Sequence, residues 1–76
     1  MIQELDRIVL SQPIPSLGLE AGDIGTVVLV HTDGKGFEVE FVTLDGETHA
    51  VTTLKQGDIR SIKPNELAHA RTVASI

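Results

Sequence analysis

The stretch AGDIGTVVLVHTDGKGFEVEFVTLDGETHAV, residues 21–51, decides the fold class of this chain. Short runs rich in Val, Ile, Thr and Phe alternate in it with turn sequences, and DGKG and LDG carry the Gly and Asp residues typical of β-hairpins. β-branched and aromatic side chains favour the half-buried surface of a pleated sheet. The same pattern extends along the chain, and we expect strands near residues 4–11, 24–32, 37–42, 47–54 and 59–63.

The connections between these strands predict an architecture. SQPIPSLGLEAGD, residues 11–23, separates the first two strands, and its prolines and glycines favour a long irregular loop. The middle connections are tight hairpins, and KQGD, residues 55–58, is typical of a single turn before the last strand. Together they predict an all-β fold, a small five-stranded SH3-like barrel over residues 1–63, in which closure of the sheet protects its edges.

The chain changes character after Pro64. Residues 64–76 contain helix-favouring residues, and Asn65 is a suitable N-cap, but the segment is too short to form a stable helix alone. We therefore expect a C-terminal tail, either a short helix or disordered, that packs on the barrel, contacts a partner or stays loose.

A hairpin register with Thr32 opposite Phe37 assigns the side chains to two faces, because side chains alternate along a strand. The expected core consists of Thr26, Val28, Val30, Phe37, Val39 and Phe41, joined by Ala50, Thr52, Leu54, Ile8, Ile59 and Ile62. The opposite face is expected to carry Val27, Leu29, His31, Glu38, Glu40, Val42, Glu47 and His49. This register places His31 opposite Glu38, and His49 near Glu40.

The outward face divides into an apolar half and an acid and histidine half. The apolar half, formed by Val27, Leu29 and Val42, has two interpretations. Either a bent second strand buries it, with help from Leu67 and Val73 of the tail, or it is an interface, since soluble monomers rarely expose a contiguous apolar patch. The polar half is either an ordinary solvated strand face or a divalent-metal site. No ligand-spacing motif such as HExxH is present, so we assign no metal-binding residue and no cofactor.

Composition argues against several classes of function. Cysteine is absent, which removes disulfides and thiolate chemistry and fits a reducing cytoplasm. Eleven acidic residues against six basic ones give a net charge of −5, and Trp and Tyr are absent, which disfavours binding to nucleic acid. No apolar run reaches the roughly 18 residues that predict a membrane span. The serines lie in no nucleophile motif, and the lone GKG lacks the spacing of a phosphate-binding loop, so we expect no enzymatic activity.

The motifs LDRIVL, GLEAGDIGTVV and EVEFVTLDGET, within residues 5–63, resemble a family of small bacterial proteins known as domain of unknown function 4926. The resemblance implies an SH3-like barrel and brings no catalytic residues with it. Members of this family resemble the small partners of toxin-like or mobile-element proteins, which implies an antitoxin or immunity role. More distantly, AGDIGTVV is similar to the KOW-type turn of ribosomal and transcription factors, although the strand that follows is acidic here.

The net charge, the expected outward face and the family resemblance together predict a non-enzymatic protein–protein interaction module. We expect it to mask another protein that has a basic surface. We expect no binding to a membrane, and a homo-oligomer is compatible with the sequence pattern. The residues expected to contact the partner are Leu17, Leu19, Leu29, Glu38, Glu40, Val42, Glu47 and Leu67, with the carboxylates steering association.

Two alternatives stay open. A KOW-like domain associated with nucleic acid would use a basic stripe formed by Lys35, Lys55, Arg60 and Lys63. A weak metal-binding regulator would use His31 and His49.

Overall fold

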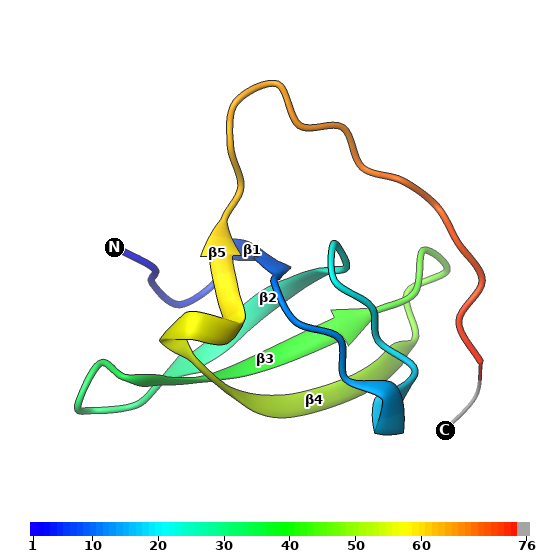
Figure 1. The fold of residues 1–76 in the computed structure, drawn as a ribbon. Coiled ribbons are helices and arrows are strands. Elements are labelled where there is room, and N and C mark those ends of the chain that lie inside the picture. The colour runs from blue at the N-terminus through cyan, green and yellow to red at the C-terminus, as the bar shows by residue number, and fades with distance from the viewer. Residues whose placement is uncertain (75–76) are drawn as a thin grey trace.

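The computed structural model describes residues 1–74 and shows a five-stranded antiparallel sheet (Figure 1). The strands are β1 (Arg7–Leu10), β2 (Ile24–Val30), β3 (Gly36–Val42), β4 (Thr48–Lys55) and β5 (Ile59–Ser61). Their order in the sheet is β4-β3-β2-β1-β5. The predicted all-β class and all five strands are confirmed, although β1, β2 and β5 are shorter than predicted. β4 and β5 lie at the two ends of this order, and closure into an SH3-like barrel stays a prediction.

The connections follow the turn chemistry of the sequence. Gly34 and Gly46 have φ angles of 70° and 91° in the two hairpins, which glycine adopts without the steric cost that a Cβ would bring. The long loop before β2 contains the short 3-10 helix η1 (Pro15–Leu17), and a second one, η2 (Gln56–Asp58), leads into β5. In the described part of the chain, no helix is long and apolar enough to cross a membrane.

The core lies on the inner face of the sheet and is closed by the long loop. Its buried side chains are Ile8, Leu10, Leu19, Val27, Phe37, Val39, Phe41, Leu54 and Ile59. Ile8, Leu10, Val27 and Val39 are almost completely inaccessible to water, so each contributes about 1.5–3 kcal/mol of transfer free energy. The predicted core positions of the third strand are confirmed, but Ile62 is 43% exposed and lies outside the core.

The register of the β2–β3 hairpin differs from the prediction. Val30 lies opposite Phe37 and Val27 opposite Val39, with Val28 as an extra residue between Val27 and Leu29. This β-bulge reverses the alternation in the first half of β2. Val27 therefore points into the core, whereas Val28 is 41% exposed, so the predicted assignments of these two residues were wrong. The predicted core position of Thr26 was also wrong, because Thr26 pairs with Glu40 on the outer side.

A second irregularity separates His49 from the acidic strand. Phe41 pairs with Ala50 and Val42 with Thr48, so His49 is the extra residue in β4. Its Nε2 atom lies 2.7 Å from the carbonyl oxygen of Leu17 in the long loop. The predicted proximity of His49 to Glu40 was therefore wrong.

The tail leaves β5 as an extended segment and arches across to the side of the long loop (Figure 1). Residues 64–74 form no helix or strand, and Asn65 has a φ angle of 72°, so it caps no helix. The last two residues of the predicted tail, 75–76, lie outside the described residues.

A substitution at Gly25 tests how tightly the sheet packs over its core. A Cβ at this position would lie 2.6 Å from Cγ1 of Val39 and 2.9 Å from Cε1 of Phe41. We expect Gly25→Ala to lower the free energy of unfolding by about 1–3 kcal/mol through overpacking, measured by urea denaturation. Gly57→Ala is the matched control, because a Cβ there meets nothing within 4 Å, and its effect should stay within about 0.5 kcal/mol. Equal effects of the two variants would contradict this packing.

Candidate protein-interaction surface

The side of the sheet that faces away from the core forms a continuous surface, which we call the outer face. Residues directly opposite each other in antiparallel strands point to the same side of a sheet. The registers therefore place Arg7, Thr26, Glu40 and Val51 in one row across four strands, and Leu29, Glu38 and Thr53 in the next. Val42 follows on β3, beside Thr48 of β4.

Several aliphatic side chains are exposed on the outer face, among them those of Leu29, Val42 and Val51. Leu29 is 47% exposed, Val42 is 45% exposed and Val51 is 55% exposed. The positions of Leu29 and Val42 agree with the sequence prediction. Val51 was missed, although its alternation with Ala50 and Thr52, both predicted to face the core, identifies it as an outward residue.

Glu38 lies opposite Leu29 on the outer face and forms hydrogen bonds with two neighbouring side chains. Nε2 of His31 lies 2.7 Å from Oε2 of Glu38, and the Thr53 hydroxyl donates to both carboxylate oxygens at 2.8 Å. The hydrogen bond from His31, followed by the one from Thr53, lowers the pKa of Glu38 below its ordinary value of 4.5. The His31 ring packs over Gly36, where a Cβ would lie 2.3 Å from its Nδ1 atom. The predicted neighbourhood of His31 and Glu38 is thus present, and it holds Glu38 ionised and fixed.

Glu40 and Glu47 have different surroundings. Glu40 accepts a hydrogen bond of 2.6 Å from the hydroxyl of Thr48, which ties β3 to β4 on the outer face. Glu47 is exposed at the end of the β3–β4 hairpin, where its backbone carbonyl accepts a hydrogen bond from the Thr43 amide. Within residues 1–74, no group of three His, Cys, Asp or Glu side chains is arranged to hold a metal ion.

The other predicted contact residues lie elsewhere. Leu19 is only 4% exposed and belongs to the core, so it is not available to a partner in the folded chain. Leu17 is half-buried and packs against the edge of the core. Leu67 is 95% exposed and lies on the tail, so the predicted leucines do not form one cluster.

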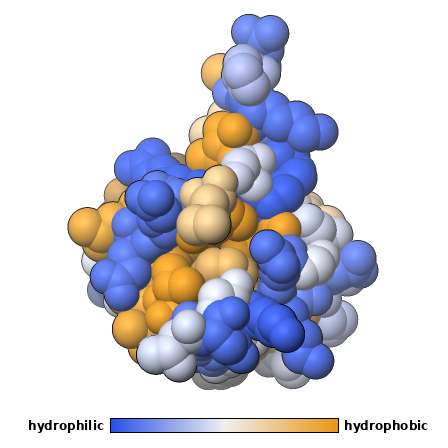
Figure 2. All heavy atoms as spheres, turned by 90° about the vertical axis from the view of Figure 1, so that its left-hand side faces the viewer, coloured by the Kyte–Doolittle hydropathy of each residue, from blue (hydrophilic) through white to orange (hydrophobic). Residues whose placement is uncertain are grey.

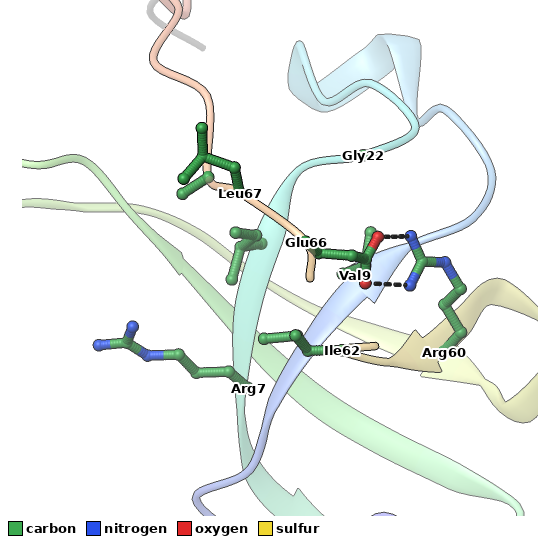
Figure 3. Close-up of a pocket in the computed structure, with 9 residues that line it drawn as sticks. Arg7, Val9, Gly22, Arg60, Ile62, Glu66 and Leu67 are labelled. Carbon is green, nitrogen blue, oxygen red and sulfur yellow. Dashed lines mark hydrogen bonds and ion pairs between the residues drawn. The ribbon is translucent and has the colours of Figure 1, made fainter. Parts of the chain in front are cut away.

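A groove that sequence reasoning missed lies where the tail leaves the sheet. Apolar surface gathers at the base of the tail and on the sheet beneath it (Figure 2). The groove has a volume of about 230 Å³, and its apolar lining consists of Val9, Ile24, Ile62, Leu67 and Ala68 (Figure 3). Arg7 and the Arg60–Glu66 pair lie at opposite ends of it (Figure 3). No motif identifies this groove, because it depends on the path of an irregular segment.

Two ion pairs hold the tail on either side of Leu67 and Ala68. Arg60 donates to both carboxylate oxygens of Glu66, at 2.8 Å and 2.6 Å, and the pKa of Glu66 falls to about 2. Further along, Arg71 donates to the two carboxylate oxygens of Asp23, at 2.9 Å and 2.5 Å, and to the carbonyl of Gly18.

The second ion pair also affects the pKa of Asp23. Partial burial raises the pKa of this carboxyl group, but hydrogen bonds from Arg71 and from the Glu20 amide outweigh that effect. The net result is a pKa below the ordinary value of 3.8. Bidentate pairs of this type are among the stronger hydrogen-bonded contacts on a protein surface, so the tail has a defined path.

The sequence that forms this sheet matches a known protein family. Residues 4–61 match Domain of unknown function (DUF4926). The chain belongs to this family. No curated protein and no solved structure matches it.

The matched residues divide the surface into two parts. All five strands of this DUF4926 protein lie within the match, so the outer face is part of the family domain. Ile62, Glu66, Leu67 and Ala68, which complete the groove, follow the end of the match. The groove therefore combines the family domain with a segment beyond it.

The pairing of Glu66 with Arg60 predicts an unusual titration. In the native protein the carboxyl group of Glu66 should titrate at a pKa of about 2, because the guanidinium favours its ionised form. We expect Arg60→Gln to raise this pKa towards the ordinary 4.5, measured from the side-chain carboxyl ¹³C shift by NMR. Lys35→Gln removes an exposed cation from the β2–β3 turn and should leave the value unchanged. A native pKa near 4.5 would contradict the pinned tail.

Proposed function

We propose that this DUF4926 protein is a non-enzymatic protein–protein interaction module that binds a partner through its outer face. The observation that carries the proposal is the arrangement of Leu29, Val42 and Val51, which are exposed beside the carboxylates of Glu38 and Glu40 on one sheet surface. Interfaces combine apolar anchors with polar groups that fix orientation in the same way.

The shape of the molecule favours a protein partner over a small ligand. Small-molecule sites are usually concave and about 300–1,000 Å³ in volume, whereas the groove encloses about 230 Å³ and the outer face is a sheet surface. The cross-strand bonds of Glu38 and Glu40 hold these side chains in place before binding, which reduces the entropy lost on association.

Charge favours a partner with a basic surface. The chain carries a net charge of −5, and the lowered pKa of Glu38 keeps this carboxylate ionised at neutral pH. A basic surface that meets these carboxylates would gain association rate through electrostatic steering. Occlusion of such a surface, as an antitoxin or immunity protein performs it, is the specific role that we propose.

The test is a pull-down with tagged protein from a lysate of the organism that encodes it. We expect one protein to be retained by the native chain and to be lost with the double variant Leu29→Asp, Val42→Asp. We expect both side chains to become buried in the complex and each to contribute about 1–2 kcal/mol to binding. Their replacement by carboxylates should therefore weaken binding at least about tenfold.

Leu44→Asp is the control for an added carboxylate, because Leu44 is 94% exposed in the β3–β4 turn and its replacement adds one of the two negative charges that the double variant adds. This variant should retain the partner like the native protein, and circular dichroism should show all variants folded. Equal retention by the double variant, or recovery of nucleic acid in place of a protein, would overturn the proposal.

A further inference from the structure

The groove at the base of the tail has a floor of aliphatic side chains that remain partly open to water. Val9 of β1 lies opposite Ile24 of β2 on one side and Arg60 of β5 on the other, so these side chains point to the same side of the sheet. Ile24 is 38% exposed, Ile62 is 43% exposed, and the tail adds Leu67 to the lining (Figure 3). An apolar group that entered the groove would remove more of this surface from water, which is favourable.

The groove has the size of one side chain. Its volume of about 230 Å³ lies below the roughly 300–1,000 Å³ of most small-molecule sites. An apolar cavity of about 150 Å³ is enough to hold a benzene ring. The groove therefore fits a single aliphatic side chain with part of the backbone that carries it, which is a common way for one protein to anchor itself on another.

Arg7 supplies a charged group at one end of this groove. Within residues 1–74, Arg60 and Arg71 each pair with a carboxylate, whereas the guanidinium of Arg7 forms no ion pair or side-chain hydrogen bond. Figure 3 shows the Arg7 side chain extending away from the Arg60–Glu66 pair. A guanidinium matches the two oxygens of a carboxylate in geometry as well as in charge. Arg7 can therefore receive a carboxylate from another molecule.

The charge around the groove differs from that of the chain as a whole. The lining contains two guanidinium groups, Arg7 and Arg60, and one carboxylate, Glu66, which sum to +1 in a chain of net charge −5. Glu66 is neutralised by Arg60 at the far end, and the carboxylate of Asp6, next to Arg7 in sequence, accepts a hydrogen bond from the Gln3 amide. The groove thus favours a negative group at its Arg7 end, whereas the carboxylates of the outer face favour a positive one.

We propose that the groove binds a segment of a second protein in which an aliphatic residue is directly followed by an acidic one. The aliphatic side chain fills the space between Ile24, Ile62 and Leu67, and the carboxylate pairs with Arg7. Neither half is sufficient alone, because an exposed ion pair contributes little without a packed neighbour. The inference does not rest on the proposed function, because it uses different residues and the opposite charge.

The test is an NMR titration of the full chain with the peptide acetyl-Ala-Leu-Asp-Ala-amide, followed through the backbone amide shifts. We expect saturable shifts at β1, β5 and residues 66–68. The peptide with Asn in place of Asp keeps the shape and removes the charge, and the peptide with Ala in place of Leu removes the anchor. Each should bind about fivefold to tenfold more weakly, because one loses a charge-assisted hydrogen bond and the other loses apolar burial.

Variants of the protein assign the carboxylate to Arg7. Arg7→Gln should weaken binding of the Leu-Asp peptide about fivefold to tenfold and leave binding of the Leu-Asn peptide unchanged, because only the first peptide uses the guanidinium. Lys35→Gln removes the same charge from the β2–β3 turn and should leave both affinities unchanged. The amide spectra also establish that each variant is folded.

Three results would overturn the proposal. The first is the absence of saturable shifts at the groove, including shifts confined to the outer face. The second is equal affinity for the Leu-Asp and Leu-Asn peptides. The third is equal weakening by Arg7→Gln and Lys35→Gln, which would show a response to total charge in place of a contact with Arg7.

Discussion

The bulge at Val28 is the constraint on which the surface of this protein depends. Val27 through Val30 is a continuous apolar run, and it cannot alternate regularly and also bury both Val27 against Val39 and Val30 against Phe37. One extra residue resolves the conflict, because Val28 and Leu29 both turn outward while the residues on either side of them face inward. The core receives Val27, and Val28 joins Leu29 on the outer side of the sheet.

The charged side chains form hydrogen bonds and ion pairs on the sheet that has this register. Glu38 and Glu40 are fixed by hydrogen bonds from β4 on the outer face, whereas Glu66 and Asp23 are used by Arg60 and Arg71 to hold the tail. The acidic balance of the chain is therefore divided between carboxylates that shape the molecule and carboxylates that remain on an open surface. This division agrees with the proposed interaction module, in which carboxylates and aliphatic side chains share one sheet surface.

Much of the fold could be predicted from local chemistry. Gly34 and Gly46 mark the hairpins, and the alternation of Phe37, Val39 and Phe41 with Glu38 and Glu40 assigns the two faces of β3 without ambiguity. The faces of β2 could not be assigned, because four consecutive apolar residues carry no alternation. The burial of Leu19 and the pairing of Arg71 with Asp23 depend on contacts between distant parts of the chain, and no local pattern encodes them.

The bulge at Val28 is tested most directly by the register of the β2–β3 hairpin in solution, measured by cross-strand nuclear Overhauser effects. A bulge there predicts contacts between the backbones of Val27 and Val39 and between those of Leu29 and Glu38, with Val28 unpaired. Contacts between Val28 and Phe41 and between Val30 and Val39 would indicate a regular ladder. They would contradict the bulge at Val28 and the burial of Val27 in the core.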